Sequence, residues 1–266
     1  MTAHANTGTV LDRILEARRA SVDHRKKVLP LTALKYGVKA APPVRDFAAA
    51  LSRDSINVLA ELKSASPSRG VIREPFDAIA LAKCLESAGA AALSVLTEEE
   101  FFHGSLKNLR DARKNVQLPI LRKDFIFDPW QVWESRANDA DSFLLIVAAL
   151  ADDELNELIA LGRELGMEPL VEVHTGEEVN RALSVGAHII GVNNRDLKTL
   201  VVRPDTSYEL IAEIPEKCIA VCESGLRTHE DLNKLRAAGY DAFLIGEHLM
   251  QSPDSGVALA QLLAPH

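Results

Sequence analysis

Short apolar runs alternate with helix-like segments along most of the chain. From residue 57 onward the runs rich in Val, Ile, Leu and Ala are NVLAELK, AALSVLT, LPILRKD, SFLLIVA, EPLVEV, HIIGVNN, IAVCES and AFLIGE. Between them, segments such as PFDAIALAKCLESAGA and THEDLNKLRAAGY space their apolar residues three and four apart, which is typical of amphipathic helices. The pattern predicts eight strands, each followed by a helix.

Near-continuous apolar strands joined by helices are typical of a parallel sheet whose outer face is covered by helices. Eight such units in roughly 210 residues predict a (β/α)8 TIM barrel. The alternative is a doubly wound open sheet, which would carry a GxGxxG turn after its first strand. The segment SASPSRG at that place does not have this motif.

The first part of the chain, about residues 1–50, lies outside this repeat. TVLDRILEARRASVDHRKKV predicts a charged helix, and PPVRDFAAALSR predicts a second helix before the first strand. The apolar face of the first helix consists of Val10, Leu11, Ile14 and Leu15. No Pro/Ser-rich linker divides the chain, so we expect a single domain over 1–266 with an N-terminal helical extension. This extension is either a plug on the bottom of the barrel or a lid over its mouth.

Several predicted strands end in charged or amide side chains. Because side chains alternate along a strand, Leu59, Glu61 and Lys63 share one face and point into the barrel if Val58, Ala60 and Leu62 meet the helices. The same reasoning gives Lys123 and Phe125, Glu172, Asn193 and Arg195, and Glu223 on four further strands. Barrel active sites lie at the carboxyl ends of the strands, and separate buried ion pairs would give little net stability. These residues therefore predict one active site.

The last two units predict a phosphate site. Ser224 and Gly225 form a turn before a helix with Thr228 as its N-cap, and Gly246 and Glu247 start a short helix. Ser252 and Pro253 are expected to open a further helix. Backbone N–H groups at helix starts bind phosphate, and the loops after strands seven and eight are the usual phosphate site of this fold.

Composition excludes several other functions. The formal net charge of −8 argues against a nucleic-acid surface, which needs a basic stripe. No apolar run approaches the ~20 residues that span a bilayer. The segment MTAHANTGTV lacks the basic region followed by an apolar stretch that is typical of a secretory signal. The cysteines form no CxxC pair and the histidines no HxH or HExxH spacing. We expect a cytoplasmic protein without metal or other cofactor.

The segments ELKSASPSRG, LTEEEFFHGS, LRKDFIFDPWQV, LLIVAAL, PLVEVHT, IGVNNRDLKTL, ESGL and FLIGEHLM resemble, in this order, the signatures of indole-3-glycerol phosphate synthase. The resemblance runs from about residue 9 to the C-terminus. It implies the ring closure, in tryptophan biosynthesis, of 1-(2-carboxyphenylamino)-1-deoxyribulose 5-phosphate to indole-3-glycerol phosphate, with loss of CO₂ and water. It also implies that the extension lies over the mouth.

The resemblance implies roles for individual residues. Lys123 matches the general acid, Glu172 the acid/base of the later dehydration, and Glu61 a carboxylate that assists it. Matches to substrate-binding positions are Lys63, Ser66, Phe125, Leu144, Asn193, Arg195 and Glu223, and matches to the phosphate loops are Ser224, Gly225, Gly246 and Glu247. The implied partner is a small phosphorylated aromatic substrate. We expect a monomer, and association with other tryptophan-pathway enzymes stays open.

Proton transfer near neutral pH places demands on two of these residues. Lys123 would need a lowered pKa, and the positive charge of Lys63 in the same mouth would act in that direction. Glu172 would need a raised pKa, which the apolar wall at Leu170 and nearby carboxylates could provide. Two alternatives remain. One is another sugar-phosphate isomerase or aldolase on the same barrel, with Lys123 as a Schiff-base nucleophile. The other is a non-catalytic sensor of a phosphorylated ligand.

Overall fold

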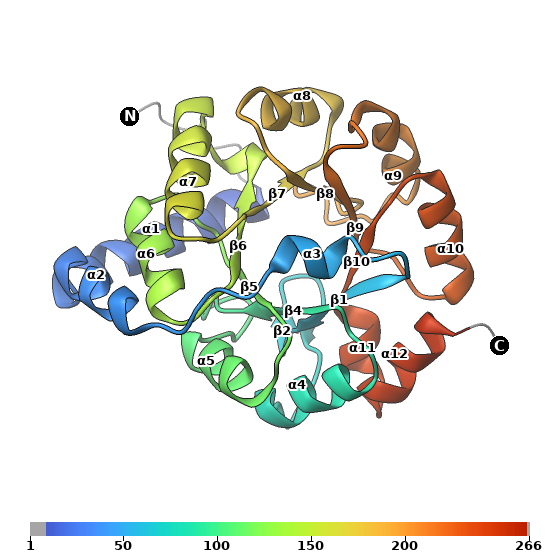
Figure 1. Cartoon of the computed structure of the whole chain (residues 1–266), viewed down its shortest axis with the longest axis horizontal. Coiled ribbons are helices and arrows are strands. Elements are labelled where there is room, and N and C mark those ends of the chain that lie inside the picture. The colour runs from blue at the N-terminus through green and yellow to red at the C-terminus, as the bar shows by residue number, and fades with distance from the viewer. Residues whose placement is uncertain (1–8, 265–266) are drawn as a thin grey trace.

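The computed structural model describes residues 9–264, so most of the segment MTAHANTGTV and the last two residues lie outside it. Eight parallel strands close into a barrel in the order β1-β10-β9-β8-β7-β6-β5-β4 (Figure 1). They are β1 Asn57–Leu62, β4 Ala92–Leu96, β5 Ile120–Lys123, β6 Ser142–Ile146, β7 Leu170–Val173, β8 Ile189–Asn193, β9 Ile219–Glu223 and β10 Ala242–Ile245. The predicted (β/α)8 barrel is confirmed, and the open-sheet alternative is wrong.

Helices surround the strands (Figure 1). They are α4 Ala78–Ser87, α5 Leu106–Asn115, α6 Pro129–Ala137, α7 Asp152–Glu164, α8 Gly176–Ser184, α9 Asp205–Leu210, α10 His229–Ala238, α11 Glu247–Gln251 and α12 Ser255–Leu263, with 3-10 turns η1 Val147–Ala149 and η2 Ile211–Glu213. The expected cap Thr228 is confirmed, because its side chain accepts from the Asp231 amide. The expected opening of the last helix at Ser252 and Pro253 is wrong. The carboxylate of Asp254 accepts from two amides of the first turn and starts α12.

Two apolar layers follow from the alternation of side chains along the strands. Val58, Ala60 and Leu62 belong to the layer between sheet and helices, whereas Leu59 points into the barrel. The residues that fill the interior include Leu59, Leu121, Leu144, Leu170, Ile189, Val221 and Leu244. The interior is therefore packed hydrocarbon, and the polar groups of the strands gather at their carboxyl ends.

The N-terminal segment forms three helices, α1 Val10–Val28, α2 Leu31–Ala40 and α3 Phe47–Leu51. The sequence predicted α1, missed α2 and made α3 too long. Asn57 donates from Nδ2 to the carbonyls of Leu51 and Asp241, which places the end of α3 at the amino ends of the strands. In Figure 1 this helix lies over the barrel axis on the near side. Leu11 of α1 lines a pocket at the carboxyl ends instead. The helices of this segment thus lie at opposite ends of the barrel.

Buried charges fix α1 to the barrel wall. Arg18 contacts Asp124, just after β5, with 2.7 Å between Nη2 and Oδ2. Arg25 contacts Glu134 of α6 at 2.5 Å. Arg122 joins the two carboxylates, at 2.9 Å from each. Because Arg18, Asp124, Arg122 and Glu134 are buried and Arg25 is half-buried, the charges need their partners, and the position of α1 is tightly specified.

A short antiparallel hairpin follows β1 where the sequence indicated only a turn. Its strands are β2 Ala65–Ser66 and β3 Gly70–Val71, with Ala65 paired to Val71. The hydroxyls of Ser66 and Ser68 lie 3.3 Å apart within it. Ser66, Ser68 and Arg69 of this hairpin line the pocket at the carboxyl ends of the strands.

Candidate active site

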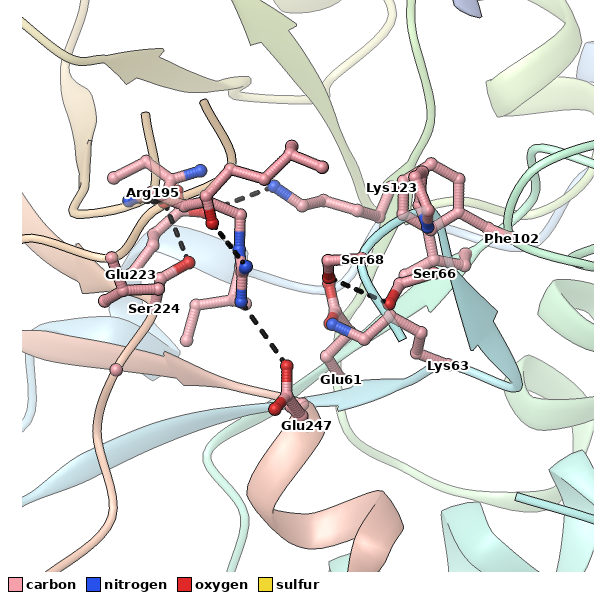
Figure 2. A pocket seen from close by; sticks show the side chains of 18 of the residues that line it. Glu61, Lys63, Ser66, Ser68, Phe102, Lys123, Arg195, Glu223, Ser224 and Glu247 are labelled. Atoms are coloured by element: carbon pink, nitrogen blue, oxygen red, sulfur yellow. Dashed lines mark hydrogen bonds and ion pairs between the residues drawn. The ribbon is translucent and has the colours of Figure 1, made fainter. Parts of the chain in front are cut away.

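A cavity of about 690 Å³ opens at the carboxyl ends of the strands (Figure 2). The residues that the sequence analysis singled out all line it, namely Glu61, Lys63, Ser66, Lys123, Phe125, Leu144, Glu172, Asn193, Arg195, Glu223, Ser224, Gly225, Gly246 and Glu247. The fold therefore brings every sequence-predicted site residue into one place.

Lys123 is the centre of this group. Its Nζ lies 2.8 Å from Oε2 of Glu172 and 3.1 Å from Oε2 of Glu223. These three residues end β5, β7 and β9, so the ammonium group connects three strands. Figure 2 shows the side chain of Lys123 reaching across the cavity toward Glu223.

The expected pKa shift of Lys123 is wrong. Burial acts to lower the pKa of Lys123, but the carboxylates of Glu172, Glu223 and Glu61 outweigh burial and raise it above its ordinary value. The expected effect of Lys63 is not among the causes of this shift. Lys63 pairs with Glu61, with 2.6 Å between Nζ and Oε2. Lys123 is therefore protonated at neutral pH.

The two carboxylates beside Lys123 shift in opposite directions. Burial acts to raise the pKa of Glu172, but Lys123 and His174 lower it to about 2, so the expected rise is wrong. The pKa of Glu223 is raised to about 8 by burial and by the charge of Glu172, against the attraction of Lys123. Two carboxylates that share one ammonium cannot both be strongly stabilised as anions. Glu223 is thus the carboxyl group that holds a proton near neutral pH.

Two glycines make room for carboxylates of the site. A Cβ at Gly246 would lie 2.1 Å from Oε2 of Glu61, and a Cβ at Gly191 would lie 2.2 Å from Oε1 of Glu223. Neither distance is compatible with the observed side-chain positions. The absence of a side chain at Gly246 therefore leaves the space that the carboxylate of Glu61 occupies, a role that the sequence did not indicate.

The turn after β9 has an unusual backbone. Ser224 and Gly225 have φ of 70° and 85°, in the left-handed region that favours glycine. Ser224 donates from Oγ to Oδ1 of Asn193 at 2.8 Å, and its carbonyl accepts from Nδ2 of Asn194 at 3.1 Å. The two asparagines thus hold this strained turn in place.

Glu247 connects two loops across the mouth. Its carboxylate lies 3.0 Å from Nε of Arg69, which belongs to the turn between β2 and β3. The other oxygen lies 3.3 Å from Nη2 of Arg195, after β8. The carboxylate that the sequence analysis placed in a phosphate loop is thus already paired with two cations.

One side of the cavity is apolar. Phe102 and Phe125 face each other with 5.9 Å between ring centroids, and Leu144 with Ile146 of β6 continues this wall. Val10, Leu11 and Ile14 of α1 add to the lining. This wall suits a flat aromatic group, and the rest of the lining includes the charged side chains described above.

Three residues at or beside this site were not predicted from the sequence: Arg69, Phe102 and His174. His174 follows β7, with Nε2 at 3.4 Å from Oε1 of Glu172. The alternation that indicated Leu170 and Glu172 continues to position 174, so the signal was present. Arg69 and Phe102 lie in irregular segments, where no periodicity indicates which way a side chain points.

Within residues 9–264, no group of three or more His, Cys, Asp or Glu is placed to hold a metal ion. None of the helices in the part of the chain that the structure describes has the length and apolar character to cross a bilayer.

A closed (β/α)8 barrel with titratable side chains gathered at the carboxyl ends of its strands defines a TIM-barrel enzyme. Solved structures with this fold include thiamine phosphate pyrophosphorylase from Pyrococcus furiosus, with a TM-score of 0.57 and 16% identity over 78% of this chain and 93% of that one. Another is 3-hexulose-6-phosphate synthase, with a TM-score of 0.59 and 12% identity over 78% of this chain and 98% of that one. At these identities the likeness concerns the fold alone.

The model of the indole-3-glycerol phosphate synthase family matches residues 11–262, and the chain belongs to this family. Indole-3-glycerol phosphate synthase of Rhodococcus jostii is 50% identical over 255 residues, covering 96% of this chain and 95% of the relative. The enzyme of the same name from a Roseiflexus species is 47% identical over 263 residues, covering 96% and 98%. The family suggested by the sequence segments is confirmed.

Proposed function

We propose that this chain closes the indole ring in tryptophan biosynthesis, converting 1-(2-carboxyphenylamino)-1-deoxyribulose 5-phosphate into indole-3-glycerol phosphate, CO₂ and water. Membership of the family supports the reaction. The observation that carries the assignment of residues is the ammonium of Lys123 between Glu172 and Glu223, beside an apolar wall in one cavity. That arrangement combines a proton donor, two carboxyl groups and a place for an aromatic ring.

In the condensation step, the ring carbon that bears the carboxylate attacks the ketone carbon of the sugar. A new C–C bond forms, the carbonyl π electrons move to oxygen, and Lys123 donates a proton to that oxygen. Loss of CO₂ then returns an electron pair to the ring. Lys123 is protonated at the outset because its neighbours raise its pKa. Glu223, with a pKa raised to about 8, can return a proton to it.

In the dehydration step, the hydroxyl group leaves as water and a proton leaves the ring system. Glu172 starts as an anion, since its pKa is lowered to about 2, and therefore acts first as a base. The pair of Glu61 and Lys63 lies at the same mouth and assists departure of the hydroxyl. Glu172 then carries the proton that it has taken and can release it as an acid.

Substrate binding uses the rest of the cavity. The turn at Ser224 and Gly225 and the start of α11 at Gly246 and Glu247 would take the phosphate, through backbone N–H groups. Lys63 and Arg195 supply positive charge for the anionic groups, Asn193 binds the hydroxyls, Ser66 approaches from the hairpin, and Phe125 with Leu144 encloses the ring. Arriving phosphate would compete with Glu247 for its two arginines.

The whole chain 1–266 would work as one domain, and of the extension of about residues 1–50 the helix α1 would cover the mouth, while α3 lies at the amino ends of the strands. The contribution of Val10, Leu11 and Ile14 to the cavity wall supports this function for α1. We place the enzyme in the cytoplasm as a monomer that acts on a small molecule.

The test is direct. Purified protein is mixed with the carboxyphenylamino deoxyribulose phosphate, and formation of the indole is followed by fluorescence. Absence of product would disprove the function. An aldolase mechanism needs a neutral amine at Lys123, which its raised pKa opposes. Borohydride treatment with substrate should therefore leave no covalent adduct on Lys123, as judged by mass spectrometry.

A further inference from the structure

His174 lies directly behind the carboxylate of Glu172. Its Nε2 is 3.4 Å from Oε1 of Glu172, while Nζ of Lys123 is 2.8 Å from the other oxygen, Oε2. Glu172 is therefore held between two cationic groups, one for each oxygen. The His174 side chain is only 11% exposed, and within residues 9–264 its Nε2 has no hydrogen bond. The contact with Glu172 is thus the available interaction for this ring nitrogen.

The start of α8 fixes the ring from the other side. Nδ1 of His174 lies 3.3 Å from Oε2 of Glu178, and the backbone N–H of His174 donates to the same oxygen at 2.7 Å. The amide of Glu178 in turn donates to Oγ1 of Thr175, the N-cap of α8. The imidazole is therefore placed by the capping structure of a helix rather than by the pocket itself.

The charges around His174 favour its protonated form. Burial acts to lower the pKa of His174, but Glu178, Glu172 and Glu223 together raise it above its ordinary value. The neighbouring turn η1 has the sequence VAA and contributes no ionisable group. Lys123 is the opposing cation, and it faces the far oxygen of Glu172.

We infer that His174 is a positioning residue for the proposed ring closure, with its imidazolium holding one oxygen of Glu172 and Glu178 holding the imidazolium. The inference rests on the proposed function. After Lys123 has given its proton to the substrate, and until Glu223 returns one, Lys123 does not attract Glu172 as a cation. His174 is then the cation that keeps Glu172 oriented and ionised, so that it can act as the base of the next step.

Two substitutions test this arrangement. His174→Asn removes the cation, and kcat at pH 7 should fall about tenfold with little change in KM, because His174 lies outside the cavity lining. Glu178→Gln keeps an acceptor for the His174 amide but removes the charge. The imidazolium of His174 then loses its proton at a lower pH. The alkaline limb in a plot of kcat against pH should therefore shift by about one pH unit toward lower pH.

Matched controls separate positioning from folding. Glu154 accepts from the Ala151 amide at the start of α7, and His229 contacts the Leu262 carbonyl through Nδ1. Glu154→Gln and His229→Asn repeat the chemistry of the two test variants at sites outside the cavity lining, and should leave the pH profile of kcat unchanged. If the test variants match these controls, or lose only thermal stability, the inference is wrong. If His174→Asn fails to fold, Glu178→Gln decides.

A second measurement does not depend on turnover. Histidine signals are followed by NMR during a pH titration, and His174 is assigned by its absence from the His174→Asn spectrum or, failing that, by the signal that moves in Glu178→Gln. Its pKa should exceed the ordinary value of about 6.5 and should fall in Glu178→Gln and Glu172→Gln. An ordinary or lower pKa in the wild type overturns the inference. Absence of turnover with a raised pKa would overturn the proposed function instead.

Discussion

Arg18 in the first helix forms a buried ion pair with Asp124, the residue that directly follows Lys123, with 2.7 Å between Nη2 and Oδ2. Asp124 also accepts from Thr97 and Arg122. The N-terminal segment is therefore joined to the end of β5, close to the ammonium group at the centre of the cavity.

Replacing Arg18 by Met should destabilise the protein and weaken substrate binding. Loss of one partner from a buried ion pair costs about 3 kcal/mol. Denaturant unfolding should show a decrease of this size, and KM should rise because α1 supplies part of the cavity wall. Arg13→Met is the control, because Arg13 is exposed on the same helix. Equal behaviour of the two variants would refute a role for the ion pair.

Replacing Lys123 by Met should abolish most turnover. The variant lacks the proton donor and leaves Glu172 and Glu223 without their shared cation, so kcat should fall by ~10³-fold or more. Indole fluorescence under saturating substrate measures this. Lys107→Met, at a lysine whose side chain is 75% exposed, should keep full activity. Retained turnover in the Lys123 variant would remove Lys123 from the mechanism.

Glu223 should make the stability of the protein depend on pH. Its pKa is raised to about 8 by burial and by the charge of Glu172. The folded state therefore binds more protons than the unfolded state between about pH 4 and pH 8. The stability from this group is fully present below about pH 4 and is lost as pH rises through 8, with a slope of at most about 1.4 kcal/mol per pH unit.

Glu223→Gln should remove this contribution. Urea unfolding at several pH values between 5 and 8 should give a flatter dependence for the variant than for the wild type. Glu209→Gln, at an exposed position, should keep the wild-type slope. The prediction fails if Glu223→Gln and wild type lose stability in parallel over this range.

Gly246→Ala should displace Glu61. The new Cβ would lie 2.1 Å from Oε2 of Glu61, which is the oxygen that contacts Lys63 at 2.6 Å. We expect kcat to fall at least about tenfold. Gly37→Ala is the control, since its Cβ would meet the nearest atom, Cβ of Ala137, at 3.7 Å. Adding Glu61→Asp, which shortens the side chain, should relieve the clash and restore part of the activity. No effect of Gly246→Ala on turnover would show that Glu61 can move freely.

The sequence predicted the barrel because buried parallel strands leave a strong pattern. Strand β1 shows this well: Val58, Ala60 and Leu62 face the helices, whereas Leu59 and Glu61 face inward. Alternation of this kind involves only neighbouring residues, so the ends of the strands and the side chains at those ends could be predicted from the sequence alone. The helix α2 was missed because its ten residues include Gly37, have no side-chain N-cap and bury only Leu34, which leaves a weak apolar pattern.

The charges of the site could not be predicted in the same way. A pKa depends on which groups are in contact, and contacts between strands far apart in the sequence leave no local pattern. Lys63 was expected to act on Lys123, yet it turns to Glu61, and Lys123 turns to two carboxylates on β7 and β9. The direction of the pKa shift at Lys123 follows from Glu172, Glu223 and Glu61, and that at Glu172 from Lys123 and His174.

The arrangement of α1 has a consequence for how the chain is made. Arg18 is separated from Asp124 by 106 positions, and Arg25 contacts Glu134, which is later still. During synthesis from the N-terminus, the earliest helix leaves the ribosome long before either partner exists. The helix can therefore form these two ion pairs only after β5 and α6 have been translated. The wall that would enclose the aromatic ring is thus finished only after the strand that supplies the proton donor.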